Sequence, residues 1–251
     1  MGQVIVLGTS NVIPEESRDN THLLVKSGKR VILIDVTANT LRRMVKGGIP
    51  VEGLTDIIVT HFHPDHVAGL PLLMMCLWLS GRREPLTIFG LKHTISRIKK
   101  MVGLFDLQEL PGFFPMHFIT IPAREGAVIL SDEDIRVEGT PVHHFIPTLG
   151  IKLTFNRENK TLVYSSDTEP CDRVVRLAKD SDVLIHEATG AFSGHSSAAQ
   201  AGRIAARAGV KRLFLIHYPD DVTMGENLIQ EARETFGQAV QLARDLMTIE
   251  L

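Results

Sequence analysis

Short apolar runs typical of β-strands alternate with helical patterns along the whole chain. Strand-like runs cover 3–7, 23–25, 31–35, 56–60 and 86–89, and the pattern resumes at 135–138, 150–155 and 161–165. Ser27-Gly28 separates two of these runs and predicts a hairpin turn. Helical patterns cover 40–46, 65–79, 94–102, 171–179, 196–208 and 226–236.

Strand-only sections and strand–helix alternation occur in both halves of the chain. A sheet-on-sheet core flanked by helices accommodates this pattern better than a purely parallel sheet. We therefore expect an α+β fold of four layers, α/β/β/α, in which two mixed sheets pack face to face and the helices lie outside. The segment 106–116, rich in Pro, Gly and Phe, predicts an ordered loop that either borders the functional site or caps the core.

Composition adds that the chain is an ordinary globular protein. Apolar residues make up 44% and charged residues 22%, which excludes a disordered chain. No short repeat or low-complexity linker divides the 251 residues, so we expect a single domain spanning 1–251. The two cysteines, Cys76 and Cys171, lie far apart, which argues against a disulfide framework.

The sequence contains no recognisable signal segment or membrane span, and its overall charge does not favour binding to nucleic acid. Its N-terminus lacks a basic region and a cleavage site, which predicts a cytoplasmic protein. The longest apolar run, 70–79, is about half of the roughly 20 residues that a membrane span needs. With 27 basic and 29 acidic residues there is no global basic field. Basic pairs at 42–43, 82–83 and 99–100 could contact phosphate or simply face solvent, and no aromatic stacking platform is evident.

Four metal-ligand side chains lie within six residues, directly after the strand-like run 56–60. They are His61, His63, Asp65 and His66, and Pro64 among them favours a turn that fans them apart. His61 and His63, at i and i+2 on an extended chain, point to the same side and could grip one metal, which leaves Asp65 and His66 for another. The cluster predicts half of a two-metal site and therefore metal-assisted hydrolysis.

Three downstream residues are candidates for the other half: His144, Asp167 and His217. Asp167 and His217 each follow a β-like apolar run, and strand ends gathered at one sheet edge can converge on a metal. Taken singly, each has a simpler interpretation. Asp167 precedes Pro170 and a helical pattern, so it could be a helix cap, and a lone histidine is usually structural.

These residues also carry a resemblance. The chain resembles the metallo-β-lactamase superfamily, closest to its ribonuclease Z and cyclic phosphodiesterase branch. The matching motifs, in order, are Leu7 to Ser10 with Pro14, Arg18 to Thr21, His61 to His66, His144 with Pro147 and Gly150, Ser166 to Thr168, His186 to Thr189, His195 to Ser197, and His217.

The resemblance implies a ligand set for two zinc ions. His61, His63 and His144 would bind one ion, Asp65, His66 and His217 the other, and Asp167 would bridge them. Nitrogen and oxygen ligands without thiolate suit zinc, but manganese or iron stays open because ligand type alone does not select strictly.

The expected chemistry is attack on phosphorus by a hydroxide held between the two metals. The expected catalytic residues are Asp65, His195 and Glu187, with His195 donating a proton to the leaving oxygen. Glu187 could orient His195 or a ligand histidine, or could equally pair with a backbone amide. Asp35, at a strand end, is expected to support a ligand.

Two departures from the tRNA-processing members change the expected substrate. Those members carry a long flexible arm that grips tRNA, whereas only a tight hairpin, turning at 156–160, fits between His144 and Asp167 here. In the tRNA-processing members, an acidic glycine-rich stretch often follows an Asp near the start of the chain, and residues 36–39 replace that stretch here. We therefore expect a phosphodiesterase for a small or cyclic phosphodiester, with a ribonuclease Z-type tRNA 3′-processing endonuclease as the alternative.

Three further interpretations fit the sequence less well. An iron-dependent redox enzyme of the same fold fits the ligand set less well, because Asp167 as a bridge and His195 as a donor favour hydrolysis. A non-catalytic module with a structural metal is disfavoured because structural zinc sites are normally closed by four ligands. An exported antibiotic hydrolase would need a signal segment. The expected partner is a small phosphodiester or RNA, and the resemblance suggests a homodimer.

Overall fold

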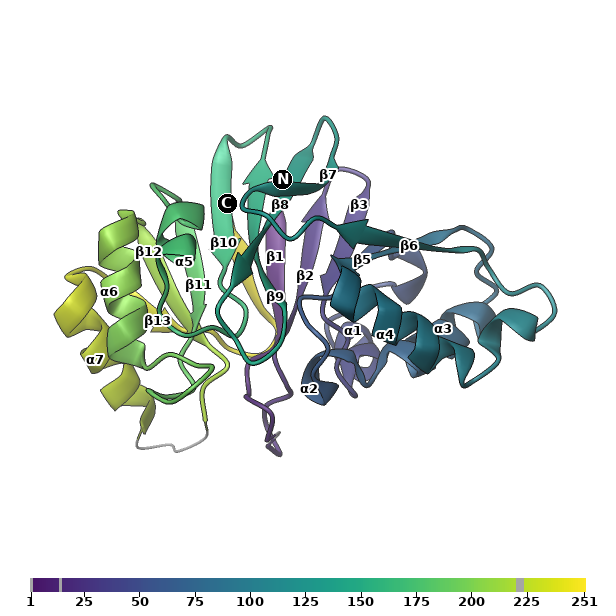
Figure 1. Cartoon of the computed structure of the whole chain (residues 1–251), viewed down its shortest axis with the longest axis horizontal. Coiled ribbons are helices and arrows are strands. Elements are labelled where there is room, and N and C mark those ends of the chain that lie inside the picture. Colours follow the sequence, from purple (N-terminus) through teal and green to yellow (C-terminus); the bar gives the residue numbers. More distant parts are fainter. Residues whose placement is uncertain (1, 14, 220–223) are drawn as a thin grey trace.

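Two seven-stranded sheets face each other in the centre of the molecule (Figure 1). Residues 2–13, 15–219 and 224–251 are described by this computed structural model, and Pro14 of the first motif lies outside them. The first sheet has the order β14 (Met247–Glu250), β1 (Gln3–Gly8), β2 (His22–Ser27), β3 (Arg30–Ile34), β4 (Asp56–Ile58), β5 (Leu86–Leu91) and β6 (Met116–Ile121). The second has the order β13 (Val240–Leu242), β12 (Arg212–Ile216), β11 (Val183–Glu187), β10 (Lys160–Tyr164), β9 (Thr148–Phe155), β8 (Ile135–Val142) and β7 (Ala127–Ser131).

Helices cover the outer face of each sheet. Figure 1 shows one group on the first sheet, α1 (Thr40–Lys46), α3 (Leu70–Leu79) and α4 (Lys92–Gly103), and another on the second, α5 (Asp172–Leu177), α6 (Ala198–Ala208) and α7 (Met224–Phe236). A short helix, α2 (Pro64–Val67), and the 3-10 helices Val51–Gly53 and Leu107–Glu109 complete the described helices. The expected four-layer α/β/β/α fold is confirmed. In the described part of the chain, no helix combines the length and apolarity that a membrane crossing requires.

Both faces of the central strands are buried, which explains why they read as continuous apolar runs. In β2, Leu23 and Val25 point into the core between the sheets, while Leu24 packs against the outer helices. The same division holds in the second sheet, where Leu162 faces inward and Val163 contacts the helical layer. Side chains alternate along a strand, so a strand covered on both sides must be apolar at every position.

The helix expected at 65–79 is broken in the structure, so that prediction is wrong in its continuity. α2 ends at Val67 and α3 starts at Leu70, with Gly69 between them. The amide of Gly69 donates to Val36 O, outside the helix, and a Cβ on Gly69 would lie 1.9 Å from Thr37 O. This close approach of the backbone to residues 36–37 separates the ligand-bearing turn from α3.

The structure also bears on the predicted turn, the predicted loop and the number of strands. The predicted hairpin turn is present at Gly28 and Lys29, between the paired residues Ser27 and Arg30, with Gly28 at φ 55°. Phe114 in the segment 106–116 is buried in the core under α3 and α4, so the segment caps the core. Strands β6, β7, β11, β13 and β14 were not predicted. That 1–251 forms one domain stays a prediction.

Parallel pairing brings the carboxyl ends of several strands to one end of the sandwich. β3, β4 and β5 are parallel neighbours in the first sheet, and β10, β11 and β12 in the second. Segments that leave these strands therefore emerge side by side, which is where open α/β sheets usually place ligands.

Gly202 allows α6 and α7 to pack closely. A Cβ there would lie 2.1 Å from Thr235 Oγ1 and 2.4 Å from Ala232 O. We expect Gly202→Ala to lower the free energy of unfolding by about 1–3 kcal/mol through overpacking, measured by urea denaturation. Gly53→Ala is the control, since its Cβ would meet nothing within 4 Å, and its effect should stay within about 0.5 kcal/mol. Equal effects would contradict this packing.

Candidate metal centre

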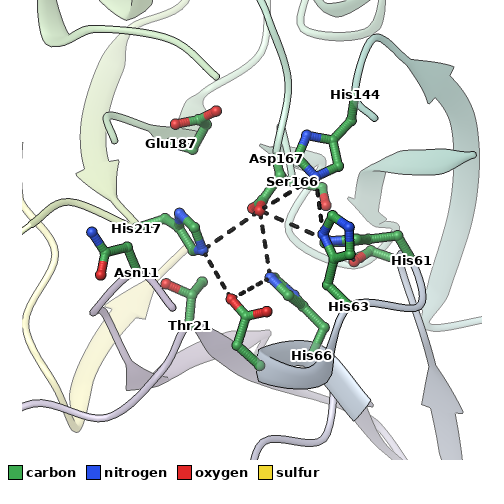
Figure 2. Close-up of polar contacts among 12 residues, drawn as sticks. Asn11, Thr21, His61, His63, His66, His144, Ser166, Asp167, Glu187 and His217 are labelled. Atoms are coloured by element: carbon green, nitrogen blue, oxygen red, sulfur yellow. Dashed lines mark hydrogen bonds and ion pairs between the residues drawn. The ribbon is translucent and has the colours of Figure 1, made fainter. Parts of the chain in front are cut away.

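Segments following the parallel strands bring seven predicted ligand residues together. His61 and His63 follow β4, Asp167 follows β10 and His217 follows β12, while His144 lies in the β8–β9 connection. Asp65 and His66 come from α2. Figure 2 shows six of the seven under their labels, gathered around one space. Among the residues after these strands, Asp35, Ser166 and His217 have φ of 65°, 54° and 54°. Left-handed backbone at non-glycine residues is uncommon and gathers at functional sites.

The carboxylate of Asp167 is at the centre of the cluster. Its Oδ2 lies 3.5, 3.6, 3.8 and 3.9 Å from Nε2 of His217, His66, His61 and His144. The cap interpretation of Asp167 does not hold, since α5 starts five residues later behind Cys171. A carboxylate with imidazoles on both sides has the geometry of a bridging ligand.

Two groups of ligand atoms flank Asp167. On one side, His63 Nδ1 lies 3.1 Å from Nε2 of His61 and 3.1 Å from Nε2 of His144. Three nitrogens bound to one tetrahedral zinc at 2.0–2.1 Å would be separated by about 3.3 Å. On the other side, Asp65 Oδ2 lies 3.4 Å from His66 Nε2 and 3.5 Å from His217 Nε2.

Hydrogen bonds fix the tautomers of His61 and His66. Asp35 Oδ2 lies 2.8 Å from His66 Nδ1, so this nitrogen carries the hydrogen and donates it. The hydroxyl of Thr60 donates to Asp35, so Thr60 Oγ1 accepts from His61 Nδ1 at 3.0 Å. Each ring then turns a lone pair on Nε2 toward Asp167, as a metal ligand requires.

His144 and His217 are held in the same way. His144 Nδ1 donates to Gly194 O at 2.7 Å. The Thr189 hydroxyl donates to His217 O, so its oxygen accepts from His217 Nδ1 at 2.8 Å. In their neutral form, all four rings therefore present an unprotonated Nε2. The supports Thr60, Thr189 and Gly194 were missed from the sequence, although Thr189 belongs to a motif that carried the resemblance.

The electrostatics of the cluster favour added positive charge. Burial opposes ionisation of Asp167, but the neighbouring charges of His217 and His66 hold its pKa well below the usual range. Burial also disfavours charge on His66, yet Asp167, Asp35 and Asp65 raise its pKa well above that of a free histidine. Without a metal, protonated histidines thus balance the negative charge of the carboxylates, and a bound cation would balance the same charge.

Unpaired buried atoms show that the residues fit metal ions. His66 Nε2, His217 Nε2 and Asp167 Oδ1 are buried without a hydrogen-bond partner. Buried polar atoms are normally paired, and an unpaired one calls for an explanation such as an ion. Nitrogen and oxygen donors at these separations, backed by oriented outer partners, are the donor set that zinc takes.

His195 and Glu187 form a pair beside the cluster. His195 Nδ1 lies 3.0 Å from Glu187 Oε1, and the His195 ring stacks on that of His217 with centroids 5.8 Å apart. Buried Glu187 also accepts from the amides of Thr168, Ser196 and Thr189. Both alternatives for Glu187 are therefore seen, because it orients His195 and pairs with backbone amides.

Two of the basic residues considered for phosphate contact instead make ion pairs or hydrogen bonds inside the protein. Buried Arg43 pairs with Asp19 and Asp245. Buried Arg82 donates to backbone carbonyls, among them Leu54 O at 2.8 Å. The solvated-face interpretation is wrong for both, and neither can grip a nucleic acid.

A family comparison agrees with this geometry. Residues 30–218 match the family model described as the β-lactamase superfamily domain. The chain belongs to the β-lactamase superfamily. The resemblance inferred from the sequence is thereby confirmed, and the chain is a metal-dependent hydrolase of this superfamily.

Individual relatives match over essentially the whole chain. Ribonuclease Z from Methanothermobacter thermautotrophicus is 29% identical, with 100% of this chain and 97% of the relative covered. Among solved structures, the metallo-β-lactamase fold protein YhfI from Bacillus subtilis has a TM-score of 0.85 at 24% identity, covering 100% and 99% of the two chains. The short form of human tRNase Z has a TM-score of 0.79 at 23% identity, covering 99% and 98%. These structural likenesses concern the fold.

The Thr189 hydroxyl offers a test of the tautomer argument. Thr189→Val keeps the shape but removes the acceptor of His217 Nδ1, so we expect zinc affinity at the His217 side to fall about 10–100-fold. Competition with a chromophoric chelator measures this affinity. Thr189→Ser keeps the hydroxyl and is the matched control. Wild-type affinity in the valine variant would contradict the assigned role.

Proposed function

We propose that this chain is a two-zinc phosphodiesterase that cleaves RNA in the manner of a ribonuclease Z. The main support for this proposal is the cluster around Asp167 together with the His195–Glu187 pair at its edge. Relatives named ribonuclease Z match the full chain, which favours our alternative interpretation over the small-substrate phosphodiesterase that we expected first. Phosphodiester hydrolysis is common to both.

Zinc is the proposed metal, with manganese and iron as the other candidates. His61, His63 and His144 would hold one ion, Asp65, His66 and His217 the second, and Asp167 would be shared. Two zinc ions would supply water of lowered pKa and positive charge for the phosphate oxygens. Within each of these two groups of three residues, the donor atoms lie within 4.8 Å of one another, which supports this assignment.

The chain's own residues would orient the substrate and move the proton. Glu187 fixes His195 through Nδ1, which leaves Nε2 to hold a proton for the departing oxygen. Asp65 lies between His66 and His217 and at the cavity above the cluster, so it combines ligation with contact to the reacting group. A positioned acid at the leaving side supports hydrolysis over an iron redox reaction or a purely structural metal.

One observation favours a second candidate, a phosphodiesterase for small or cyclic substrates. β9 and β10 are joined by a tight hairpin in which Phe155 pairs with Lys160, so no arm extends between them. The alignment with the archaeal relative spans 309 positions, more than the 251 residues of this chain, so that relative holds segments that are lacking here. Without a gripping arm, a small diester could reach the cluster as readily as RNA. A cytoplasmic location and a homodimer stay predictions.

Two histidine variants test the division of roles. His63→Ala should lose tightly bound metal and turnover together, because it removes a ligand. His195→Ala should keep its metal but lower kcat about 10²-fold or more, because only the proton donor is lost. Metal content by mass spectrometry and hydrolysis of bis(p-nitrophenyl) phosphate measure both. His117→Ala, on the exposed side of β6, is the control. Full turnover in His63→Ala would overturn the proposal.

A substrate panel decides between the two candidates. At physiological salt, the zinc-loaded protein should cut precursor tRNA at its 3′ trailer if the ribonuclease assignment is right. Hydrolysis of cyclic nucleotides or bis(p-nitrophenyl) phosphate with intact precursor tRNA would instead establish the small-substrate enzyme. The absence of metal-dependent hydrolysis throughout the panel would reject both.

A further inference from the structure

Two exposed aromatic rings flank His195. Phe145 and Phe192 are 62% and 55% exposed, and both line the cavity of ≈ 540 Å³ above the metal cluster. Their ring centroids lie 6.2 and 5.2 Å from that of His195. No aromatic platform was predicted from the sequence, because the two residues belong to different loops that only the fold brings together.

Two glycines of the His195 loop seat these rings. A Cβ on Gly194 would lie 2.4 Å from the Phe145 ring, and a Cβ on Gly190 would lie 2.6 Å from the Phe192 ring. Gly194 has φ of 81° and Gly190 of 147°, conformations that other residues rarely adopt. Each ring therefore packs against glycine backbone on one side, while more than half of the surface of each residue stays exposed to a ligand.

Apolar side chains also line the cavity. Val12 and Ile13, 60% and 71% exposed, line it together with the phenylalanines. None of the described lining residues is a lysine or an arginine. The part of a substrate beyond the phosphate would thus meet apolar and aromatic surface rather than charge.

We propose that Phe145 and Phe192 determine specificity by stacking on the nucleobase of the nucleoside that departs toward His195. The proposal rests on phosphodiester hydrolysis as the function. A nucleobase is the occupant because it offers a flat face to a phenyl ring, and such stacking tolerates any base. Phenylalanine forms no hydrogen bonds, so these rings distinguish a nucleoside from a bare sugar but do not select among the four bases. The cavity volume is in the range of small-ligand sites.

A cycle of two substrates and two proteins isolates the stacking contact. The substrates are a diribonucleoside monophosphate and its analogue without the base on the leaving side, which is the product that carries no phosphate. For the zinc-loaded wild-type protein, kcat/KM should fall about tenfold or more when this base is absent. Phe192→Ala should cause a similar loss on the complete substrate and almost none on the abasic one. Phe145→Ala should likewise lower kcat/KM for the complete substrate and leave that for the abasic substrate almost unchanged.

Matched variants separate stacking from general apolar contact. Phe192→Leu keeps apolar volume but no aromatic face, so it should resemble Phe192→Ala, whereas Phe192→Tyr should retain the preference for the complete substrate. Phe105→Ala removes another exposed ring, 58% exposed beyond α4, and should change neither substrate. Equal losses on both substrates, or wild-type behaviour of the leucine variant, would overturn the proposal.

A binding measurement keeps this proposal distinct from the function on which it rests. In the zinc-loaded His195→Ala protein, a dinucleotide with 2-aminopurine on the leaving side should show quenched fluorescence, and adding Phe192→Ala should raise its Kd about tenfold. Hydrolysis of bis(p-nitrophenyl) phosphate without quenching would refute the stacking and leave the hydrolase intact. Quenching without hydrolysis of any diester by the wild-type protein would refute the function and keep the base site.

Discussion

When they are neutral, the imidazole rings around the Asp167 carboxylate face it with nitrogens that carry no hydrogen. The nearest four, on His61, His66, His144 and His217, lie within 3.9 Å of Oδ2, and their hydrogens point away, to partners outside the cluster. Burial makes such unmet acceptors costly unless a cation or a proton joins them. Positive charge in this pocket, from a cation or a proton, would therefore stabilise it. The strands and hydrogen-bond partners around the pocket hold its acceptors in that arrangement.

The four-layer fold supplies that pocket from segments far apart in sequence. Parallel strands of both sheets end at the same edge, so β4, β10 and β12 each deliver ligand residues to it. The outer partners Asp35 and Thr189 come from the same edge, after β3 and β11. The loop between β11 and α6 also carries His195 and the glycines that seat two aromatic rings. The groups proposed for metal ligation, proton donation and base stacking are therefore adjacent because strand ends are adjacent.

Local pattern and resemblance anticipated much of this from the sequence. The segment 61–66 after β4 indicated half of the residues that the structure brings together, and the order of the motifs pointed to His144, Asp167 and His217. The break at Gly69 was not foreseeable, because it depends on how closely the backbone of 36–37 approaches. Strand β14 pairs with β1 at the other end of the chain, and β6 is half exposed at a sheet edge, so neither shows a strong local signal. Phe145 and Phe192 had no helical or strand spacing that could relate them.

Anomalous diffraction from crystals of the zinc-loaded protein would locate the ions relative to Asp167. We expect two zinc peaks about 3.5–4 Å apart on either side of the Asp167 carboxylate, one nearest His61, His63 and His144 and the other nearest Asp65, His66 and His217. A single peak, or zinc bound away from Asp167, would contradict this expectation.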